Sequence, residues 1–281
     1  MDETKLSQAR KEILQKIKEY EQAGRFDEDV ENDPPAPVLM PDKVDYLCKK
    51  LSSKIKMRTA NFIGDRYFLG LIKKDILVID GVEGVENLSA LQNGAVVICN
   101  HFSPFDNYIV FHCIRKYMPK KWLYKIIREG NYTNFPGLYG FLFRNCNTLP
   151  LSSNRRTMMN MLSACDTLLK RGETILIYPE QAMWWNYKKP RPFKIGGFKI
   201  AYKSKVPVIP TLITMQDDES RLDGDGYPVQ RHTLHIMPAV YPDLSLSEKE
   251  GAQKMMEECF NAVKNKYEEV YQTPLSYGNE E

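Results

Sequence analysis

Short apolar runs that alternate with helical segments are the feature that most constrains the fold of this chain. Seven such runs read as strands: Ile76–Ile79, Ala95–Cys99, Trp122–Ile127, Thr148–Leu151, Thr174–Tyr178, Val208–Thr214 and Thr233–Met237. Helical patterns fall between or after them, at roughly 105–117, 135–144, 155–171, 194–203 and 247–271. This alternation predicts a layered α/β/α domain with a mixed, largely parallel sheet. Unbroken runs such as Ala-Val-Val-Ile-Cys at 95–99 are typical of strands buried on both faces.

Helical segments precede this alternating region. Residues 4–23 predict a charged helix with an apolar stripe, and the acidic, proline-rich residues that follow it predict a linker or a strapping arm. We therefore assign 1–40 to an N-terminal helix and linker, and 41–281 to the main domain. Its first part, 41–75, predicts one or two amphipathic helices. Their apolar face either packs on the domain itself or lies on a membrane surface.

Charge is unevenly distributed along the 281 residues, although the net charge is only +3. Residues 1–35 hold ten acidic and six basic side chains, whereas 43–75 hold three acidic and nine basic ones. Residues 188–205 hold seven basic side chains and no acidic one. Such basic patches suit phosphates, acidic carrier proteins or anionic lipid. Nucleic acid matches the charge too, but no nucleic-acid-binding motif accompanies it, so we expect no nucleic-acid partner.

Cysteine usage and hydropathy bear on the compartment. The six cysteines are scattered without a Cys-x-x-Cys pair, which favours free thiols in a reducing compartment. The start, Met-Asp-Glu-Thr-Lys, does not read as a signal peptide. No apolar run approaches the ~18 residues that a membrane span needs. His232 and His235 are three apart on a predicted strand and so point to opposite faces, and we expect no metal site.

A histidine and an aspartate follow the strand at 95–99. His101 stands at its carboxyl end, where open α/β sheets place catalytic groups. Pro104 predicts the start of a helix, with Asp106 in its first turn. The carboxylate can accept the Nδ1–H of the imidazole, which leaves Nε2 free to take a proton from a hydroxyl. The spacing alone equally allows a loop histidine with no chemical role.

Four sequence blocks in order distinguish these readings. They are Asn100-His101-Phe-Ser-Pro-Phe-Asp106; Pro136-Gly137-Leu-Tyr-Gly140 through Arg144-Asn-Cys-Asn-Thr148-Leu-Pro150-Leu151; Ile177-Tyr178-Pro179-Glu180-Gln181 with Phe193-Lys194-Ile195-Gly196; and Val206-Pro207-Val208-Ile209-Pro210. With these blocks, roughly residues 85 to 240 resemble the glycerolipid acyltransferase family, the lysophosphatidate acyltransferase-like group.

The resemblance implies transfer of a fatty acyl group from a thioester, on acyl carrier protein or coenzyme A, to a lysolipid hydroxyl. It implies no other cofactor. The histidine is the base and the hydroxyl attacks directly, without an acyl-enzyme. The residues agree, since Ser103 lacks a Gly-x-Ser-x-Gly context and Cys99 and Cys113 lie in apolar segments.

The resemblance also implies the site residues. His101 and Asp106 form the catalytic pair, and Glu180 and Lys194 lie on the acceptor side. Further substrate-binding candidates are Asn100, Arg128, Arg144, Arg155 and Gly196. Glu180 follows the strand at 174–178, and its alternative role is that of a carboxylate stabilising a helix N-terminus.

The chain departs from the family where the family holds the acceptor phosphate. Glu180-Gln181-Ala182-Met183-Trp184 replaces the usual Glu-Gly-Thr-Arg, and Ser153 stands where the second block usually ends in arginine. Nearby cations offer substitutes: Arg155, Arg156, Lys188, Lys189, Arg191 and Lys194. Trp184, Trp185 and Tyr187 either line an acyl groove, lie at the lipid interface or pack in the core.

The leading hypothesis is a 1-acylglycerol-3-phosphate-like acyltransferase of phospholipid biosynthesis, bound peripherally on the cytoplasmic, inner face of the membrane. One alternative is the same chemistry on a non-phosphate acceptor, such as an amino-lipid or a glycolipid. The other is a lipid-binding or carrier-binding protein without turnover.

Overall fold

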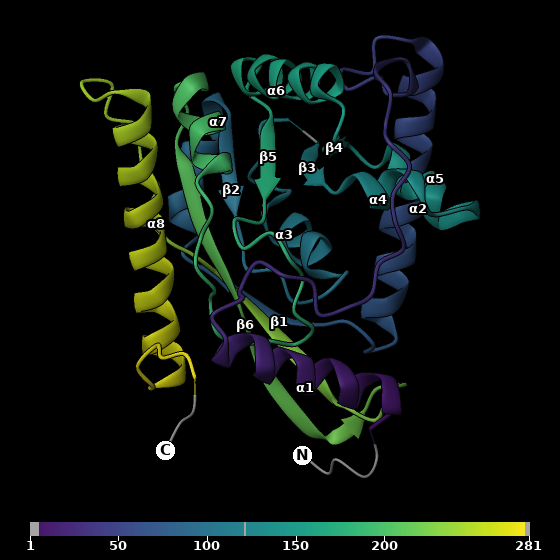
Figure 1. Cartoon of the computed structure of the whole chain (residues 1–281), viewed down its shortest axis with the longest axis vertical. Coiled ribbons are helices and arrows are strands. Elements are labelled where there is room, and N and C mark those ends of the chain that lie inside the picture. Colours follow the sequence, from purple (N-terminus) through teal and green to yellow (C-terminus); the bar gives the residue numbers. More distant parts are fainter. Residues whose placement is uncertain (1–5, 121, 279–281) are drawn as a thin grey trace.

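A seven-stranded sheet forms the centre of the molecule (Figure 1). The computed structural model describes residues 6–120 and 122–278. The strands follow the order β1-β7-β6-β2-β5-β3-β4. Their bounds are β1 Val78–Glu83, β2 Ala95–Ile98, β3 Leu123–Ile127, β4 Thr148–Pro150, β5 Thr174–Ile177, β6 Val208–Leu222 and β7 Pro228–Ile236. Only β6 and β7 pair in antiparallel fashion among these strands, so the predicted mixed, largely parallel sheet is confirmed.

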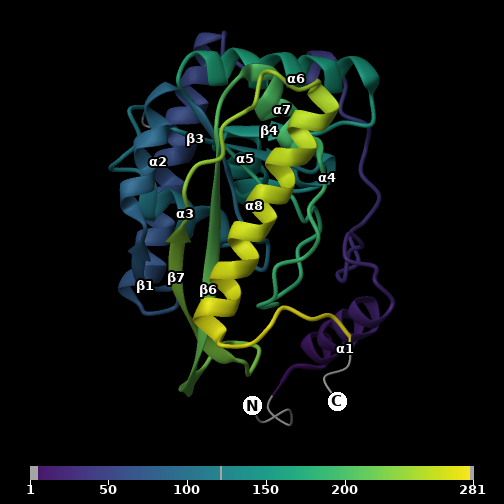
Figure 2. The same ribbon diagram turned by 90° about the vertical axis from the view of Figure 1, so that its left-hand side faces the viewer.

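Helices cover both faces of the sheet (Figures 1 and 2). Their bounds are α1 Gln8–Gln22, α2 Leu51–Lys73, α3 Asp106–Ile114, α4 Glu129–Thr133, α5 Gly137–Asn145, α6 Arg155–Lys170, α7 Gly196–Ser204 and α8 Glu248–Tyr271, with 3₁₀ turns η2 Pro41–Lys43 and η3 Val85–Asn93. One hydrophobic cluster joins α6, α7 and α8 to the sheet, and a second joins α3, η3 and the end of α2 to its other face.

Strand β2 shows why its sequence is apolar throughout. Val96 and Ile98 belong to the first cluster, whereas Ala95 and Val97 belong to the second. Each of these side chains is at most 1% exposed. Since successive side chains of a strand point to opposite faces, a strand covered on both sides must be apolar at every position. The strand thereby places the residues that follow it at the carboxyl edge of a rigid sheet.

Most predicted elements are present, and the differences are local. Strand β1 begins two residues later than expected, and β6 and β7 form a longer hairpin than predicted. Residues 41–75, where one or two amphipathic helices were expected, contain η2 and the single long helix α2, with turns between them. Helix α4 and the 3₁₀ segment η3 were not expected. Helix α4 has only five residues, and η3 follows the period of three residues per turn of a 3₁₀-helix, which the α-helical pattern does not detect.

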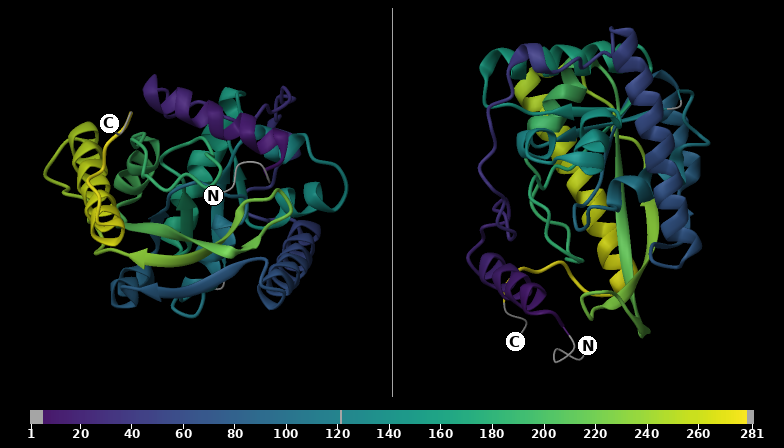
Figure 3. Two further views of the ribbon diagram at one scale, coloured as in Figure 1. Left: turned by 90° about the horizontal axis from the view of Figure 1, so that it is seen from below. Right: turned by 90° about the vertical axis from the view of Figure 1, so that its right-hand side faces the viewer.

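The N-terminal helix and the segment after it dock onto the domain. Helix α1 begins at Gln8, and the Ser7 side chain accepts a hydrogen bond from the Arg10 amide. The predicted start of this helix at residues 4 and 5, and the polar first five residues, lie outside the described residues. Ile17 of α1 packs with Val30 and Trp184 in a small hydrophobic cluster. Figure 3 shows α1 along one flank of the molecule, with α8 and α2 at opposite sides.

Helix α2 buries one side and exposes the other. Met57, Ala60 and Gly64 are buried, while Leu51 and Phe62 are 73% and 63% exposed. Part of the apolar face therefore packs on the domain and part meets solvent. Within residues 6–120 and 122–278, no helix combines the length and the apolar character needed to cross a bilayer. All six cysteines are free thiols.

Candidate active site

The loop between β2 and α3 brings His101 and Asp106 into contact. The imidazole Nδ1 lies 2.7 Å from the carboxylate Oδ2. The Asp106 side chain is 1% exposed and that of His101 is 22% exposed, so the carboxylate is shielded while the imidazole is accessible. The same Oδ2 accepts the amide N–H groups of Phe102 at 3.2 Å and Ser103 at 3.4 Å. The carboxylate in the first turn of α3 thus points back to the loop, as the sequence predicts.

The second oxygen of Asp106 is held by Tyr178, which follows β5. The phenol donates to Oδ1 over 2.6 Å. Its ring also stacks on the imidazole of His101, with centroids 4.1 Å apart and planes 16° apart. Burial, together with the Asp106 carboxylate, raises the pKa of Tyr178 well above its usual value. The phenol therefore stays protonated and remains a donor.

These contacts determine which imidazole nitrogen can act as a base. An ionised carboxylate only accepts hydrogen bonds, so Nδ1 carries the proton and Nε2 carries the lone pair. Among the described residues, Nε2 has no hydrogen-bond partner. The arrangement is that of a general base: Asp106 fixes the tautomer of the imidazole, and Asp106 and Tyr178 together fix its ring plane.

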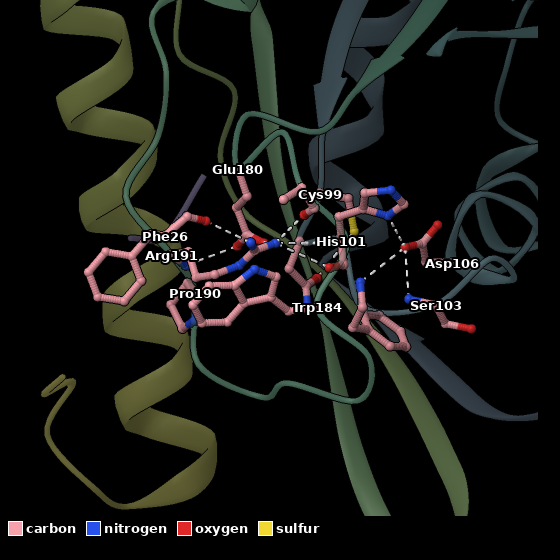
Figure 4. Close-up of polar contacts among 12 residues, drawn as sticks. Phe26, Cys99, His101, Ser103, Asp106, Glu180, Trp184, Pro190 and Arg191 are labelled. Carbon is pink, nitrogen blue, oxygen red and sulfur yellow. Dashed lines mark hydrogen bonds and ion pairs between the residues drawn. The ribbon is translucent and has the colours of Figure 1, made fainter. Parts of the chain in front are cut away.

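A buried ion pair supports the main chain of the same loop (Figure 4). Glu180 and Arg191 are 2% and 0% exposed, and Arg191 Nη2 lies 2.8 Å from Glu180 Oε2. That oxygen also accepts the His101 amide N–H at 3.2 Å, and Oε1 accepts the Arg191 amide N–H at 3.0 Å. Arg191 further donates to the carbonyl oxygens of Ala182 and, at 3.3 Å, His101. Glu180 therefore holds the main chain of the loop that carries His101.

A family model described as acyltransferase matches residues 81–214, which hold the His101–Asp106 dyad, Tyr178 and Glu180. This part of the chain is therefore similar to the acyltransferase family. The chloroplastic 1-acyl-sn-glycerol-3-phosphate acyltransferase of Brassica napus is 30% identical over 132 residues, which are 46% of this chain and 35% of that protein. A protein of the same description from Chlamydomonas reinhardtii is 29% identical over 127 residues, 45% of this chain and 36% of that one.

The fold has a solved counterpart. The 1-acyl-sn-glycerophosphate acyltransferase PlsC from Thermotoga maritima superposes with a TM-score of 0.54 and 22% identity, over 82% of this chain and 87% of that one. This likeness concerns the fold, and it confirms the predicted layered α/β arrangement. The matches to the curated plant and algal proteins span about a third of their length.

Three of the four expected acceptor-side cations, Arg155 excepted, form ion pairs or donate to main-chain carbonyl oxygens. Lys194 Nζ lies 2.9 Å from Asp27 Oδ2. Arg128 pairs with Asp29 and, at 3.3 Å, with Asp33.

Three further candidates have different surroundings. Arg144 donates to the carbonyl oxygens of Tyr132 and Phe135 at 3.3 and 3.0 Å, which supports the turn between α4 and α5. Arg155 is exposed at the first position of α6. Gly196 is exposed at the first position of α7, with open space where a side chain would stand.

Two candidates occupy buried positions that the sequence did not predict. Asn100 is 4% exposed, donates to the Ile213 carbonyl at 3.0 Å and accepts its N–H at 2.8 Å, so it ties β2 to β6. Glu180 was expected at the acceptor, yet both of its oxygens are engaged by the protein. In this structure both residues shape the loop that carries His101, and neither presents a free polar group to a substrate.

The structure shows the surroundings of the residues that depart from the family pattern. Trp184 and Trp185 are 0% and 7% exposed, so of the roles considered for them core packing is correct. The Ser153 amide donates to Glu129 at 3.1 Å, which places a carboxylate beside the position where the family has an arginine.

Sequence reasoning missed the roles of Tyr178 and Arg191. Tyr178 lies in a recognised block, and a hydroxyl at a strand end next to His101 was the available signal. Arg191 stood only among possible phosphate ligands, and its full burial was not predictable from the flanking Pro190 and Pro192.

Other chemistries find little support among the described side chains. Burial raises the pKa of Cys113 to about 11 and that of Cys99 further, so neither thiol is readily ionised. No group of three His, Cys, Asp or Glu side chains in the described chain is arranged to hold a metal ion.

Proposed function

We propose that this chain transfers a fatty acyl group from a thioester, on acyl carrier protein or coenzyme A, to the hydroxyl of a lysolipid in phospholipid biosynthesis. The observation that carries the proposal is the His101–Asp106 contact at 2.7 Å with Nε2 left open. The plant and algal relatives are named for 1-acyl-sn-glycerol-3-phosphate, which makes that lysolipid the first acceptor to test.

The chemistry follows from the dyad. Nε2 takes the proton of the acceptor hydroxyl while its oxygen attacks the thioester carbonyl, forming a tetrahedral oxyanion. Asp106 stabilises the imidazolium that results. The C–S bond then breaks, and the thiolate takes the proton from the imidazolium. The products are the ester and the free thiol, and the dyad returns to its starting state.

Substitution of the dyad tests the proposal. We expect His101→Ala to lower kcat by about 10²- to 10⁴-fold, the usual contribution of general-base catalysis. The measurement is formation of diacylated product from purified protein, an acyl thioester and lysophosphatidate. Ser103→Ala keeps the amide that contacts Asp106 and is expected to retain activity, because no acyl-serine forms. Undiminished turnover in His101→Ala would contradict the mechanism.

We further propose that the protein binds peripherally at the cytoplasmic, inner face of the membrane. The exposed apolar side chains of α2, among them Leu51, Ile55 and Phe62, support a surface-bound state. The basic residues of the same helix favour the anionic lipid of that leaflet.

A second candidate is the same reaction on a non-phosphate acceptor, an amino-lipid or a glycolipid. It is favoured by the missing arginine of the third block and by the ion pairs at Lys194 and Arg128. A panel of lysolipids separates the two candidate functions, because strict preference for lysophosphatidate would exclude a non-phosphate acceptor. Vesicle binding without turnover on any acceptor would instead favour a non-catalytic binding protein.

A further inference from the structure

An acidic segment of the N-terminal region lies against the candidate active site. We call residues 25–33 the acidic arm. Its aspartates pair with two of the four cations expected on the acceptor side: Asp27 with Lys194, and Asp29 and Asp33 with Arg128. Since Asp27 and Asp29 are two residues apart, both cations meet the same short stretch of chain.

The arm is held in place by its main chain and not only by its charges. The Phe26 carbonyl accepts from Arg191 Nη1 at 2.8 Å, and the Glu28 carbonyl accepts from Trp184 Nε1 at 2.9 Å. The Arg191 side chain (Nη2) and the main-chain amide of Trp184 also donate to the His101 carbonyl, at 3.3 and 3.1 Å. The arm is therefore one side chain away from the catalytic loop, as Figure 4 shows for Phe26 and Arg191.

The charge pairs, unlike these anchors, are open to solvent. The side chains of Asp27 and Lys194 are both 46% exposed. Those of Arg128, Asp29 and Asp33 are 34%, 41% and 59% exposed. Exposed pairs of this kind are weak and exchange readily with dissolved ions, so a bound anion can compete for the cations while the main-chain anchors persist.

We propose that the acidic arm determines acceptor specificity: its aspartates occupy the cations that a phosphate headgroup would bind, and so disfavour anionic acceptors relative to uncharged ones. This inference rests on the proposed acyl transfer. A phosphate must displace the carboxylates or remain beside them, where like charges repel. An uncharged headgroup incurs neither cost. The arm thus acts as a built-in competitor for phosphate at Lys194 and Arg128.

The test replaces the three aspartates in one variant, Asp27→Asn with Asp29→Asn and Asp33→Asn. Asparagine keeps the shape of each side chain, and the anchors at Phe26 and Glu28 are untouched. With one acyl donor, kcat/KM is measured for lysophosphatidate and for monoacylglycerol at low salt. We expect kcat/KM for lysophosphatidate to rise roughly tenfold through a lower KM, as the loss of two or three weak pairs implies. For monoacylglycerol, kcat/KM should change by less than about twofold.

Glu31→Gln is the matched control. It removes a carboxylate from the same arm, but Glu31 pairs with Arg10 of α1 at 3.3 Å and not with an acceptor-side cation. The kcat/KM of Glu31→Gln for each of the two acceptors should equal that of the unmodified chain. At about 1 M salt, where charges are screened within ~3 Å, the difference between the triple variant and the unmodified chain should shrink.

Two results would overturn the inference. One is an unchanged ratio of the two acceptors in the triple variant. The other is an equal loss for both acceptors together with a lower melting temperature, which would make the arm a structural strap.

A binding measurement keeps the inference separate from the proposed function. If the unmodified chain acylates neither acceptor, the proposed function fails, and calorimetry with glycerol 3-phosphate still tests the arm. Tighter binding by the triple variant supports the inference, and equal binding overturns it.

Discussion

At the scale of single residues, the surroundings of Asp106 decide how the base is held. One of its oxygens faces the imidazole of His101 and two main-chain amides, and the other faces the phenol of Tyr178. The carboxylate is buried, so its charge is stabilised by these donors and not by water. The phenol therefore affects both the position of the carboxylate and the strength with which it holds the imidazolium.

Tyr178→Phe removes this phenol donor while keeping the ring that stacks on His101. We expect kcat/KM to fall by roughly ten- to a hundredfold, because a hydrogen bond to a charged group contributes about 1.5–3 kcal/mol. Without the donor, Asp106 attracts the imidazolium more strongly, so the acid limb of the pH–rate profile should move to higher pH. In the unmodified chain the raised pKa of Tyr178 means that loss of the phenol proton does not limit activity below pH of about 10.

The measurement is kcat/KM against pH for this variant beside Tyr202→Phe. Tyr202 lies near the end of α7, away from His101 and Asp106, and its hydroxyl donates to the carbonyl oxygens of Asp243 and Leu246. The control should leave the shape of the profile unchanged. A Tyr178→Phe profile that overlays that of the unmodified chain would remove Tyr178 as a positioning residue.

The Glu180–Arg191 pair makes a prediction about stability. Arg191→Met leaves the Glu180 carboxylate buried without its cation, which costs about 3–5 kcal/mol for a pair of this kind. Adding Glu180→Gln removes the uncompensated charge and should recover part of that loss. Urea unfolding gives both free energies. A loss below about 1 kcal/mol in the single variant would show that the pair is not the support inferred here.

The residue scale also shows what the sequence reveals. The His101–Asp106 contact was predictable, because both residues lie within one strand-to-helix loop. The burial of Arg191 was not, because it depends on the Phe26 carbonyl, 165 positions away, and on the ring of Trp184. Local pattern shows which groups are present but not which distant segment covers them.

At the scale of elements, apolar pattern predicts strands only where both faces are covered. β2 and β5 were found within one residue of their predicted ends. β6 was expected to end at Thr214 but continues to Leu222, paired with β7. The extension reads Gln-Asp-Asp-Glu-Ser-Arg after Met215, and its side chains are largely exposed. Hydrogen bonds between the two strands form this part of the hairpin, and they leave no apolar signal.

The contact between α7 and α8 gives a prediction at this scale. A Cβ on Gly251 of α8 would lie 2.0 Å from the ring of Tyr202. The hydroxyl of that ring shares its proton between the carbonyl oxygens of Asp243 and Leu246, so the ring cannot move away freely. Alanine gains about 1 kcal/mol in helix propensity, but the overlap costs about 1–3 kcal/mol, so Gly251→Ala should be destabilising.

Gly70→Ala on α2 is the matched control, because nothing lies within 4 Å of the added Cβ. It should raise the free energy of unfolding by about 0.5–1 kcal/mol. The two variants should therefore move the urea midpoint in opposite directions. An increase for Gly251→Ala would mean that the two helices separate without cost.

At the scale of the whole molecule, charge and apolar surface are segregated. The acidic arm pairs with two of the expected acceptor-side cations, Lys194 and Arg128, whereas the basic residues of α2 lie among exposed apolar side chains. Both features were visible in composition, and a strapping arm was one of the two predicted roles for the acidic stretch. Its partners were not predictable, since Asp29 and Arg128 are 99 positions apart and local pattern carries no information at that distance.

The exposed face of α2 leads to the last prediction. If this face meets lipid, Ile55→Asp with Phe62→Asp should weaken binding to anionic vesicles. Each side chain contributes about 1.5–3 kcal/mol when fully buried, so partial insertion implies at least roughly a tenfold loss for the pair. Ile55 and Phe62 are 56% and 63% exposed, so folding should be unaffected.

Leu222→Asp is the matched control for this prediction. Leu222 lies at the end of β6 and is 45% exposed, so this variant makes the same chemical change elsewhere and should bind vesicles as the unmodified chain does. Co-sedimentation at low salt measures all three proteins, and equal binding would mean that α2 does not contact the bilayer.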